Sequence, residues 1–173
     1  MATGKTDHHI EGDNVLVLER VFDAPRDLVF EMFTDCKHLK HWWGPRGFDL
    51  SACEIDFRPG GTWLYCMKCV DENMGDFFGT ESWGKQVFHE IDRPNSITYT
   101  DYFADAEGNI NTELPATDST LEFIDQGDTT KLVSRSTYAN SESLKTVMDM
   151  GMLQGISETW DRLAERIQTV ASR

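Results

Sequence analysis

Three ionisable residues stand in apolar or aromatic surroundings, where their side chains could take part in chemistry. Glu54 and Asp101 lie in strand-like apolar runs, and His41 directly precedes Trp42 and Trp43. If either carboxylate points inward, burial raises its pKa and makes it a candidate acid or base. If it points outward, it only solvates a strand, which is the commoner arrangement because unpaired carboxylates are rarely buried. His41 would titrate near neutrality at the mouth of a cavity.

No catalytic motif with a diagnostic spacing accompanies these residues. The sequence has no P-loop, no G-x-S-x-G elbow, no dinucleotide fingerprint and no H-E-x-x-H pair. His38 and His41 stand one helical turn apart, but no third metal ligand is near them in the sequence. We therefore expect no metal and no cofactor, and the sequence gives no direct evidence for an enzyme.

The cysteines are predicted to be free thiols, because no secretion signal precedes them. They are Cys36, Cys53, Cys66 and Cys69. Cys66 and Cys69 have C-x-x-C spacing inside a strand-like run, where residues three apart face opposite sides of a sheet. We expect them to share neither a zinc ion nor a disulfide.

The overall charge and length restrict the class of protein. Sixteen Lys and Arg against thirty Asp and Glu give a net charge of -14, which repels nucleic acid and anionic membranes. No apolar run is long enough to span a bilayer, so we expect a cytoplasmic protein, either monomer or dimer. The 173 residues suit a flexible polar tail at 1–13 and a single domain at 14–173.

The C-terminal stretch from Ser141 to about Val170 is predicted to form one long helix. Apolar residues recur there at steps of three and four, which places them on one buried stripe. They are Leu153, Ile156, Trp160, Leu163, Ile167 and Val170. Gly151 and Gly155 interrupt this helix at a cost of about 1 kcal/mol each. Either the helix approaches the sheet backbone closely there, or the missing side chains leave empty volume.

The preceding chain reads as strands with two short helices after the first strand. Strand-like runs alternate with turn residues such as Arg58-Pro59-Gly60-Gly61. The expected strands are 15–22, 48–57, 62–70, 77–91, 96–103, 117–124 and 131–138. Consecutive strands joined by tight turns predict an antiparallel sheet, so the fold class is α+β. Such a sheet must curl, and the terminal helix would lie on its concave face.

Several segments together resemble one known family. They are Phe22-Asp23-Ala24-Pro25, Trp42-Trp43-Gly44-Pro45, Cys53 to Gly61, Gly151-Met152, Gly155 and Asp161 to Glu165. In this order they resemble the family named after the activator of the ninety-kilodalton heat-shock protein ATPase, within the START-like superfamily. The resemblance implies a helix-grip fold, in which a curved antiparallel sheet wraps around the C-terminal helix and an apolar cavity. That superfamily includes small-molecule carriers, cyclases and chaperone regulators, among which the fold cannot choose.

We interpret the protein as one that binds an apolar or aromatic small molecule between sheet and helix. The alternatives are an enzyme of cyclase or hydratase type acting on such a ligand, and a regulator of a chaperone ATPase acting through protein contact. Strand aromatics form core more often than ligand walls, but in a cavity fold one face serves as both. The predicted cavity residues are His41, Trp42, Trp43, Glu54, Trp63, Tyr65, Trp83, Asp101, Tyr102, Met152, Gly155 and Ile156.

Overall fold

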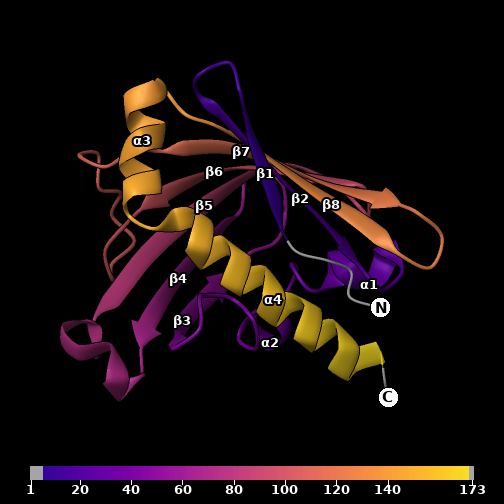
Figure 1. Cartoon of the computed structure of the whole chain (residues 1–173), viewed down its shortest axis with the longest axis horizontal. Helices are drawn as coiled ribbons and strands as arrows, with labels where there is room; N and C mark the ends of the chain where they lie inside the picture. The colour runs from indigo at the N-terminus through magenta and orange to yellow at the C-terminus, as the bar shows by residue number, and fades with distance from the viewer. Residues whose placement is uncertain (1–5, 172–173) are drawn as a thin grey trace.

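A single antiparallel sheet and the helices that cover one of its faces make up the protein (Figure 1). The computed structural model describes residues 6–171. The strands are β1 (Asp7–Glu11), β2 (Val15–Phe22), β3 (Phe48–Ile55), β4 (Thr62–Cys69), β5 (Glu81–Asp92), β6 (Ser96–Phe103), β7 (Thr117–Asp125) and β8 (Thr130–Thr137). The helices are α1 (Arg26–Glu31), α2 (Cys36–Leu39), the 3₁₀ segment η1 (Glu72–Phe77), α3 (Ser141–Asp149) and α4 (Met152–Ala171). None of these helices is long and apolar enough to cross a membrane.

The strand order shows how the last strand returns to lie beside the N-terminal hairpin. The eight strands run β1-β2-β8-β7-β6-β5-β4-β3, and each pair is antiparallel. From β3 to β8 every strand lies beside its neighbour in sequence, as consecutive strands usually do. Two short helices connect β2 to β3 at the opposite edge, and α4 crosses the concave face diagonally (Figure 1). This is the predicted helix-grip architecture.

The predicted N-terminal tail is partly a strand. Residues Asp7–Glu11 form β1, which pairs along its length with β2 in a hairpin that turns at Gly12. All side chains of β1 are exposed, so the strand has no alternation of apolar and polar residues by which the sequence would indicate it. It forms because its backbone pairs with β2. The strand therefore corrects the tail assignment over residues 7–11, while residues 1–5 lie outside the described residues.

The predicted long helix is two helices that meet at Gly151. Asn140 caps α3 by accepting a hydrogen bond from the backbone N–H of Ser143. Gly151 has φ +83°, a left-handed conformation that ends α3, and α4 begins at the next residue. Apolar periodicity continues through this junction, which is why the sequence pattern alone indicated one helix.

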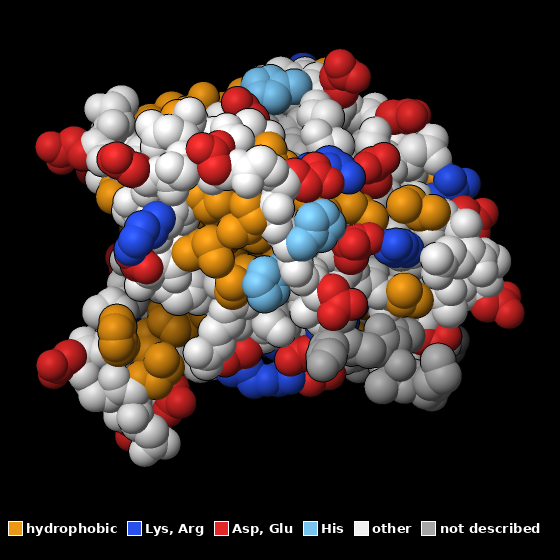
Figure 2. Space-filling view, turned by 45° about the horizontal axis from the view of Figure 1, so that its top comes forward, with side chains coloured by type: hydrophobic (Ala, Val, Ile, Leu, Met, Phe, Trp, Pro, Cys, Tyr) orange, Lys and Arg blue, Asp and Glu red, His pale blue; other side chains and the backbone are white. Residues whose placement is uncertain are grey.

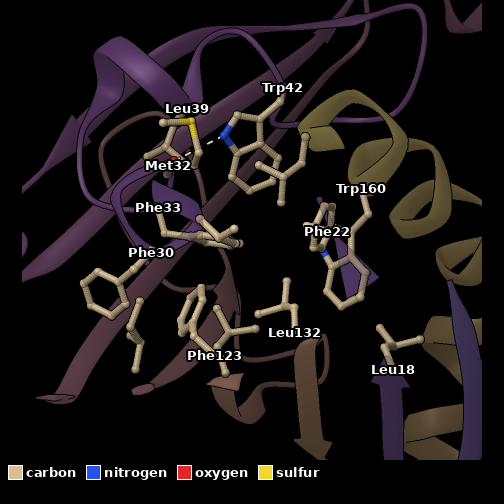
Figure 3. Close-up of a cluster of buried hydrophobic side chains, with 14 of the residues drawn as sticks. Leu18, Phe22, Phe30, Met32, Phe33, Leu39, Trp42, Phe123, Leu132 and Trp160 are labelled. Atoms are coloured by element: carbon tan, nitrogen blue, oxygen red, sulfur yellow. Dashed lines mark hydrogen bonds between the residues drawn. The ribbon is translucent and has the colours of Figure 1, made fainter. Parts of the chain in front are cut away.

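One end of the space between sheet and helices is a dense apolar core (Figure 3). Trp160 packs its ring edge against Phe22, with ring centroids 6.2 Å apart. Leu132 of β8 and Leu163 of α4 are completely buried. Trp42 lies in the same core, where its indole N–H donates to the carbonyl of Met32 at 3.2 Å. Close packing of this kind makes each of these side chains expensive to truncate.

A disulfide joins α2 to β3, which corrects the prediction that all the cysteines are free. Cys36 is the first residue of α2 and Cys53 lies on β3, and their Cα atoms are 6.0 Å apart. The prediction rested on cellular compartment, which does not say which cysteines the fold brings together. Cys66 and Cys69 are free and buried, as expected.

Candidate functional site

The inward-facing side chains of the sheet change in kind along the strands. On β7 they pass from Phe123 in the core to Ser119 near the other end of the strand. On the neighbouring β8 they pass from Leu132, beside Phe123, to Ser136, beside Ser119. Large apolar residues therefore give way to small hydroxyl residues on adjacent strands at the same level. Less volume is filled there, so a cavity can persist between sheet and helices.

A cavity of about 250 Å³ occupies that end of the fold. Its walls come from six strands (β2, β4, β5, β6, β7 and β8), and Val147 of α3 with Met152 and Ile156 of α4 cover it. Most of the lining is apolar or aromatic. Among the described residues that line it, none is Lys, Arg or His. A small uncharged or cationic molecule is the kind of ligand that such a lining accepts.

Asp101 is the carboxylic acid in the cavity wall. The hydroxyl of Tyr65 donates to it, at 3.1 Å from Oδ1 and 3.4 Å from Oδ2. Burial raises the pKa of Asp101 to about 7, although the hydrogen bonds from Tyr65 and from the backbone of Tyr102 lower it. Near neutral pH the carboxyl therefore exchanges between its neutral and charged forms. A group with this pKa can act as a proton donor or acceptor, or as an anchor for a ligand.

Tyr65 depends on a glycine of the neighbouring strand for its position. Gly84 pairs with Tyr65 across β4 and β5, and an ideal Cβ on Gly84 would lie 2.3 Å from atoms of the tyrosine ring. The ring thus occupies the space above Gly84, which no other residue type leaves open. Burial, followed by the charge of Asp101, raises the pKa of Tyr65 well above its ordinary value. The hydroxyl of Tyr65 therefore stays protonated at physiological pH and can donate to the Asp101 carboxylate.

Further hydroxyl groups are paired with one another in the cavity. The hydroxyls of Ser119 and Ser136 lie 3.0 Å apart, and Ser119 is also hydrogen-bonded to the hydroxyl of Tyr99. Tyr138 is hydrogen-bonded to Thr117. Burial raises the pKa of both tyrosines, so they stay protonated at physiological pH. Several polar groups of the lining are thus bonded to one another, in an otherwise apolar cavity.

Trp43, in the loop between α2 and β3, forms part of the cavity wall. Its ring lies edge-to-face with Trp63, at a centroid distance of 4.6 Å, and with Tyr65 at 5.4 Å. Its indole Nε1 is buried and has no hydrogen-bond partner among the described residues. The loop that follows is held to α4 by Arg162, whose Nη1 donates to the carbonyls of Gly44 and Phe48, each at 2.8 Å. This arginine therefore fixes the wall relative to the covering helix.

The structure brings most of the predicted site residues together. Those that line the cavity are Trp43, Tyr65, Trp83, Asp101, Tyr102, Met152 and Ile156. Trp63 lines an adjoining pocket of about 50 Å³, to which Trp43 and Ile156 also contribute. The helical stripe indicated Ile156. The strand residues were instead chosen as aromatic or acidic side chains in apolar runs, and the sequence left open which of them face the cavity.

Four predicted site residues, His41, Trp42, Glu54 and Gly155, are not among those that line the cavity. Trp42 is fully buried in the core, whereas His41 is exposed. Glu54 is exposed because its neighbours on β3 turn inward, so its side chain only solvates the strand. A Cβ on Gly155 would meet nothing within 4 Å, which argues against close approach to the sheet backbone there.

Sequence reasoning missed the hydroxyl side of the cavity. The missed residues include Tyr99, Thr117, Ser119, Ser134, Ser136 and Tyr138. A signal for them existed, since inward positions of β7 and β8 change from Phe and Leu to Ser and Thr while the alternation continues. Serine on a strand is usually read as solvent-facing, and only the register with neighbouring strands shows that these serines turn inward.

Comparison with known proteins agrees with this architecture. Residues 23–168 match the family described as Activator of Hsp90 ATPase homolog 1-like protein. The chain belongs to that family. Its segments Trp42–Pro45 and Asp161–Arg162, which carried the resemblance, meet in the fold: Arg162 binds the carbonyl of Gly44, and Asp161 accepts from Arg20 at 2.6 Å. These family residues therefore attach α4 to the loop and to β2.

Several solved structures share the fold. Protein Ms6760 from Mycobacterium smegmatis is 27% identical, with a TM-score of 0.79 and 96% of each chain covered. A protein from Arthrobacter aurescens is 24% identical, with a TM-score of 0.81 over 97% of this chain and 93% of the other. The AHSA1 protein from Silicibacter pomeroyi is 21% identical, with a TM-score of 0.68 over 90% and 98%. No curated protein matches the sequence.

Proposed function

We propose that the protein binds an apolar or aromatic small molecule in the cavity between its sheet and the α3–α4 pair. The observation that supports this most directly is the enclosure of about 250 Å³ itself, with aromatic walls and hydroxyl groups. Pockets for drug-sized ligands are usually about 300–1,000 Å³, so a ligand of one or two rings fits best. The ring of Trp43 and the side chains of Met152 and Ile156 would contact its apolar surface.

The placement of three serines supports the interpretation of the cavity as a ligand pocket rather than as a packing defect. Ser134, Ser136 and Ser119 occupy inward positions whose counterparts further along the same strands are leucine and phenylalanine. A core that merely packed poorly would be lined by apolar side chains alone, whereas this lining offers hydrogen-bonding groups to a guest.

A cavity-filling variant tests this proposal. Ser134→Leu adds a bulky apolar side chain to the cavity lining, so binding of the neutral fluorescent two-ring probe 2-naphthalenemethanol should fall about tenfold or more. Thr137→Leu is the matched control, because it makes a similar change on the same strand at an exposed position. Equal probe binding by wild type and Ser134→Leu would contradict the proposal. Native mass spectrometry of freshly isolated protein should also show a small molecule that is lost in Ser134→Leu.

Enzymatic turnover of such a ligand is a second candidate, favoured by Asp101. A carboxyl with a pKa of about 7 beside the hydroxyl of Tyr65 suits general acid–base chemistry, as a cyclase or hydratase would need. Incubation of an identified ligand with wild type and with Asp101→Asn distinguishes carrier from enzyme. Chemical conversion by wild type alone would support the enzyme, and recovery of unchanged ligand from both would support the carrier.

Contact with a chaperone is the third candidate, favoured by an apolar lobe beside β4 and β5. Val70, Phe77 and Phe78 are exposed there, around η1, and Figure 2 shows hydrophobic side chains on this lobe at the lower left. Exposed aromatic clusters often mark protein contacts. The ATPase rate of a 90-kDa heat-shock protein should then rise with wild type and not with Phe77→Ser. An unchanged rate with both would argue against this function.

A further inference from the structure

The charge of the cavity is unbalanced. Among the described residues that line it, Asp101 is the one that carries a carboxyl, and no cationic side chain faces it. The tyrosines near it, Tyr65 of β4, Tyr99 of β6 and Tyr138 after β8, are held neutral by burial. The helical cover adds only apolar side chains, Val147 among them. A carboxylate in such surroundings is stable only when something pairs with it.

The hydrogen bonds of Asp101 leave room for such a partner. The hydroxyl of Tyr65 and the backbone N–H of Tyr102 are the donors that it receives within the described part of the chain. An ionised carboxylate offers about four acceptor positions, so acceptor capacity remains open to a ligand. Trp43 and Trp83 line the same cavity, and aromatic faces attract cations.

We propose that the ligand class is a small arylalkylamine, a primary amine joined to an aromatic ring through a saturated carbon, bound as its ammonium ion by Asp101 with its ring against the tryptophan side of the cavity. This inference rests on the proposed binding function and specifies the chemistry of that same cavity. The ammonium would complete the hydrogen bonding of the carboxylate and neutralise its charge in one step. An anionic ligand, such as a fatty acid, would instead place a second negative charge beside Asp101 with no cation to offset either.

The proposal predicts a specific pH dependence. Because burial raises the pKa of Asp101 to about 7, the empty cavity holds a neutral carboxyl in mild acid. The ammonium binds the charged form, so amine affinity should fall about tenfold for each pH unit below 7. Above 7 it should be constant until the amine itself loses its proton. A neutral ligand of the same shape should show no such change.

Three probes that share one ring system test the proposal. They are 2-naphthylmethylamine, 2-naphthalenemethanol and 2-naphthoate, whose affinities are measured by titration calorimetry at pH 6 and pH 8. Wild type should bind the amine at least about tenfold more tightly than the alcohol at pH 8 and the carboxylate most weakly. Asp101→Asn should lose the preference for the amine and keep its affinity for the alcohol. Asp118→Asn, a carboxyl change on the next strand outside the cavity lining, should behave as wild type.

The outcomes separate this inference from the function on which it rests. If wild type binds amine and alcohol equally at pH 8, the amine proposal is wrong and the cavity-binding function stands. If none of the probes binds wild type, both proposals fail. Should Asp101→Asn not fold, the pH series on wild type decides alone: an amine affinity that does not change between pH 6 and pH 8 overturns the proposal.

Discussion

At one end of the space between sheet and helices, α4 places Trp160, Leu163 and Ile167 in an apolar core, all of them nearly or completely buried. At the other end, the first turns of the same helix place Met152 and Ile156 over a cavity. The strands below are continuous between the two ends. What differs is side-chain volume on the inward positions of β7 and β8, where leucine and phenylalanine give way to serine.

This comparison separates residues that hold the fold together from residues that border the cavity. A large residue in the core has close neighbours on every side, so its loss leaves a cavity that the rest cannot fill. A residue that borders an existing cavity has fewer contacts to lose. The same helix should therefore be sensitive to mutation at one end and tolerant at the other.

Trp160→Ala should have the largest effect. It removes a nearly inaccessible indole that packs against Phe22, and we expect a loss of about 3–5 kcal/mol in the free energy of unfolding. Urea denaturation measures it. A loss well under 1 kcal/mol would mean that the space around Trp160 is not a closely packed core.

Asp101→Asn should change how stability depends on pH. Below about pH 4 the carboxyl is neutral in both folded and unfolded chains. Because burial raises its folded-state pKa to about 7, wild type loses stability from pH 4 to 7 and levels off above that. The free energy of unfolding of the variant, relative to that of wild type, should therefore rise over this window. The rise is at most about 4 kcal/mol for a shift of about three pKa units. Parallel stability curves for the two proteins would show that the carboxyl is well solvated.

Leu163→Ala and Ile156→Ala measure the contrast within α4 directly. Leu163 is completely buried in the core, so its truncation should cost about 2–5 kcal/mol. Ile156 borders the cavity and is only partly buried, so the similar deletion should cost about 1 kcal/mol. Equal losses at the two positions would remove the distinction between the ends.

The two glycines give the smallest effects, of opposite sign. Gly151 has φ +83°, so Gly151→Ala should destabilise by about 1–2 kcal/mol. Gly155 is helical and a Cβ there meets nothing within 4 Å, so Gly155→Ala should stabilise by up to about 1 kcal/mol. Thermal melts of both variants check this. A stabilising Gly151→Ala would mean that α3 and α4 can join into one helix.

The fold was largely predictable because its signals are local and repeated. Alternation on strands and the stripe ending in Trp160 and Leu163 identified the sheet and its covering helix. The junction at Gly151 escaped detection because a single residue with positive φ leaves the apolar spacing unchanged. β1 escaped because a strand at the sheet edge needs no buried side chains.

The candidate site was only partly predictable, because it depends on register. Asp101 and Glu54 looked alike in sequence, each a carboxylate in an apolar strand. Pairing places Asp101 opposite Thr117 on the inner face, whereas the odd-even phase of β3 turns Glu54 to solvent. That phase cannot be read from either strand alone. The Cys36–Cys53 bridge needed tertiary contact in the same way.

Gly84 has a wider influence than its size suggests. Its missing side chain makes room for the ring of Tyr65, and the hydroxyl of that ring lowers the pKa of Asp101. A methyl group at position 84 would displace the ring and weaken that hydrogen bond, so the acid would become weaker still. The proton affinity of the carboxyl can therefore be adjusted from a neighbouring strand, by a backbone position that makes no hydrogen bond to the acid.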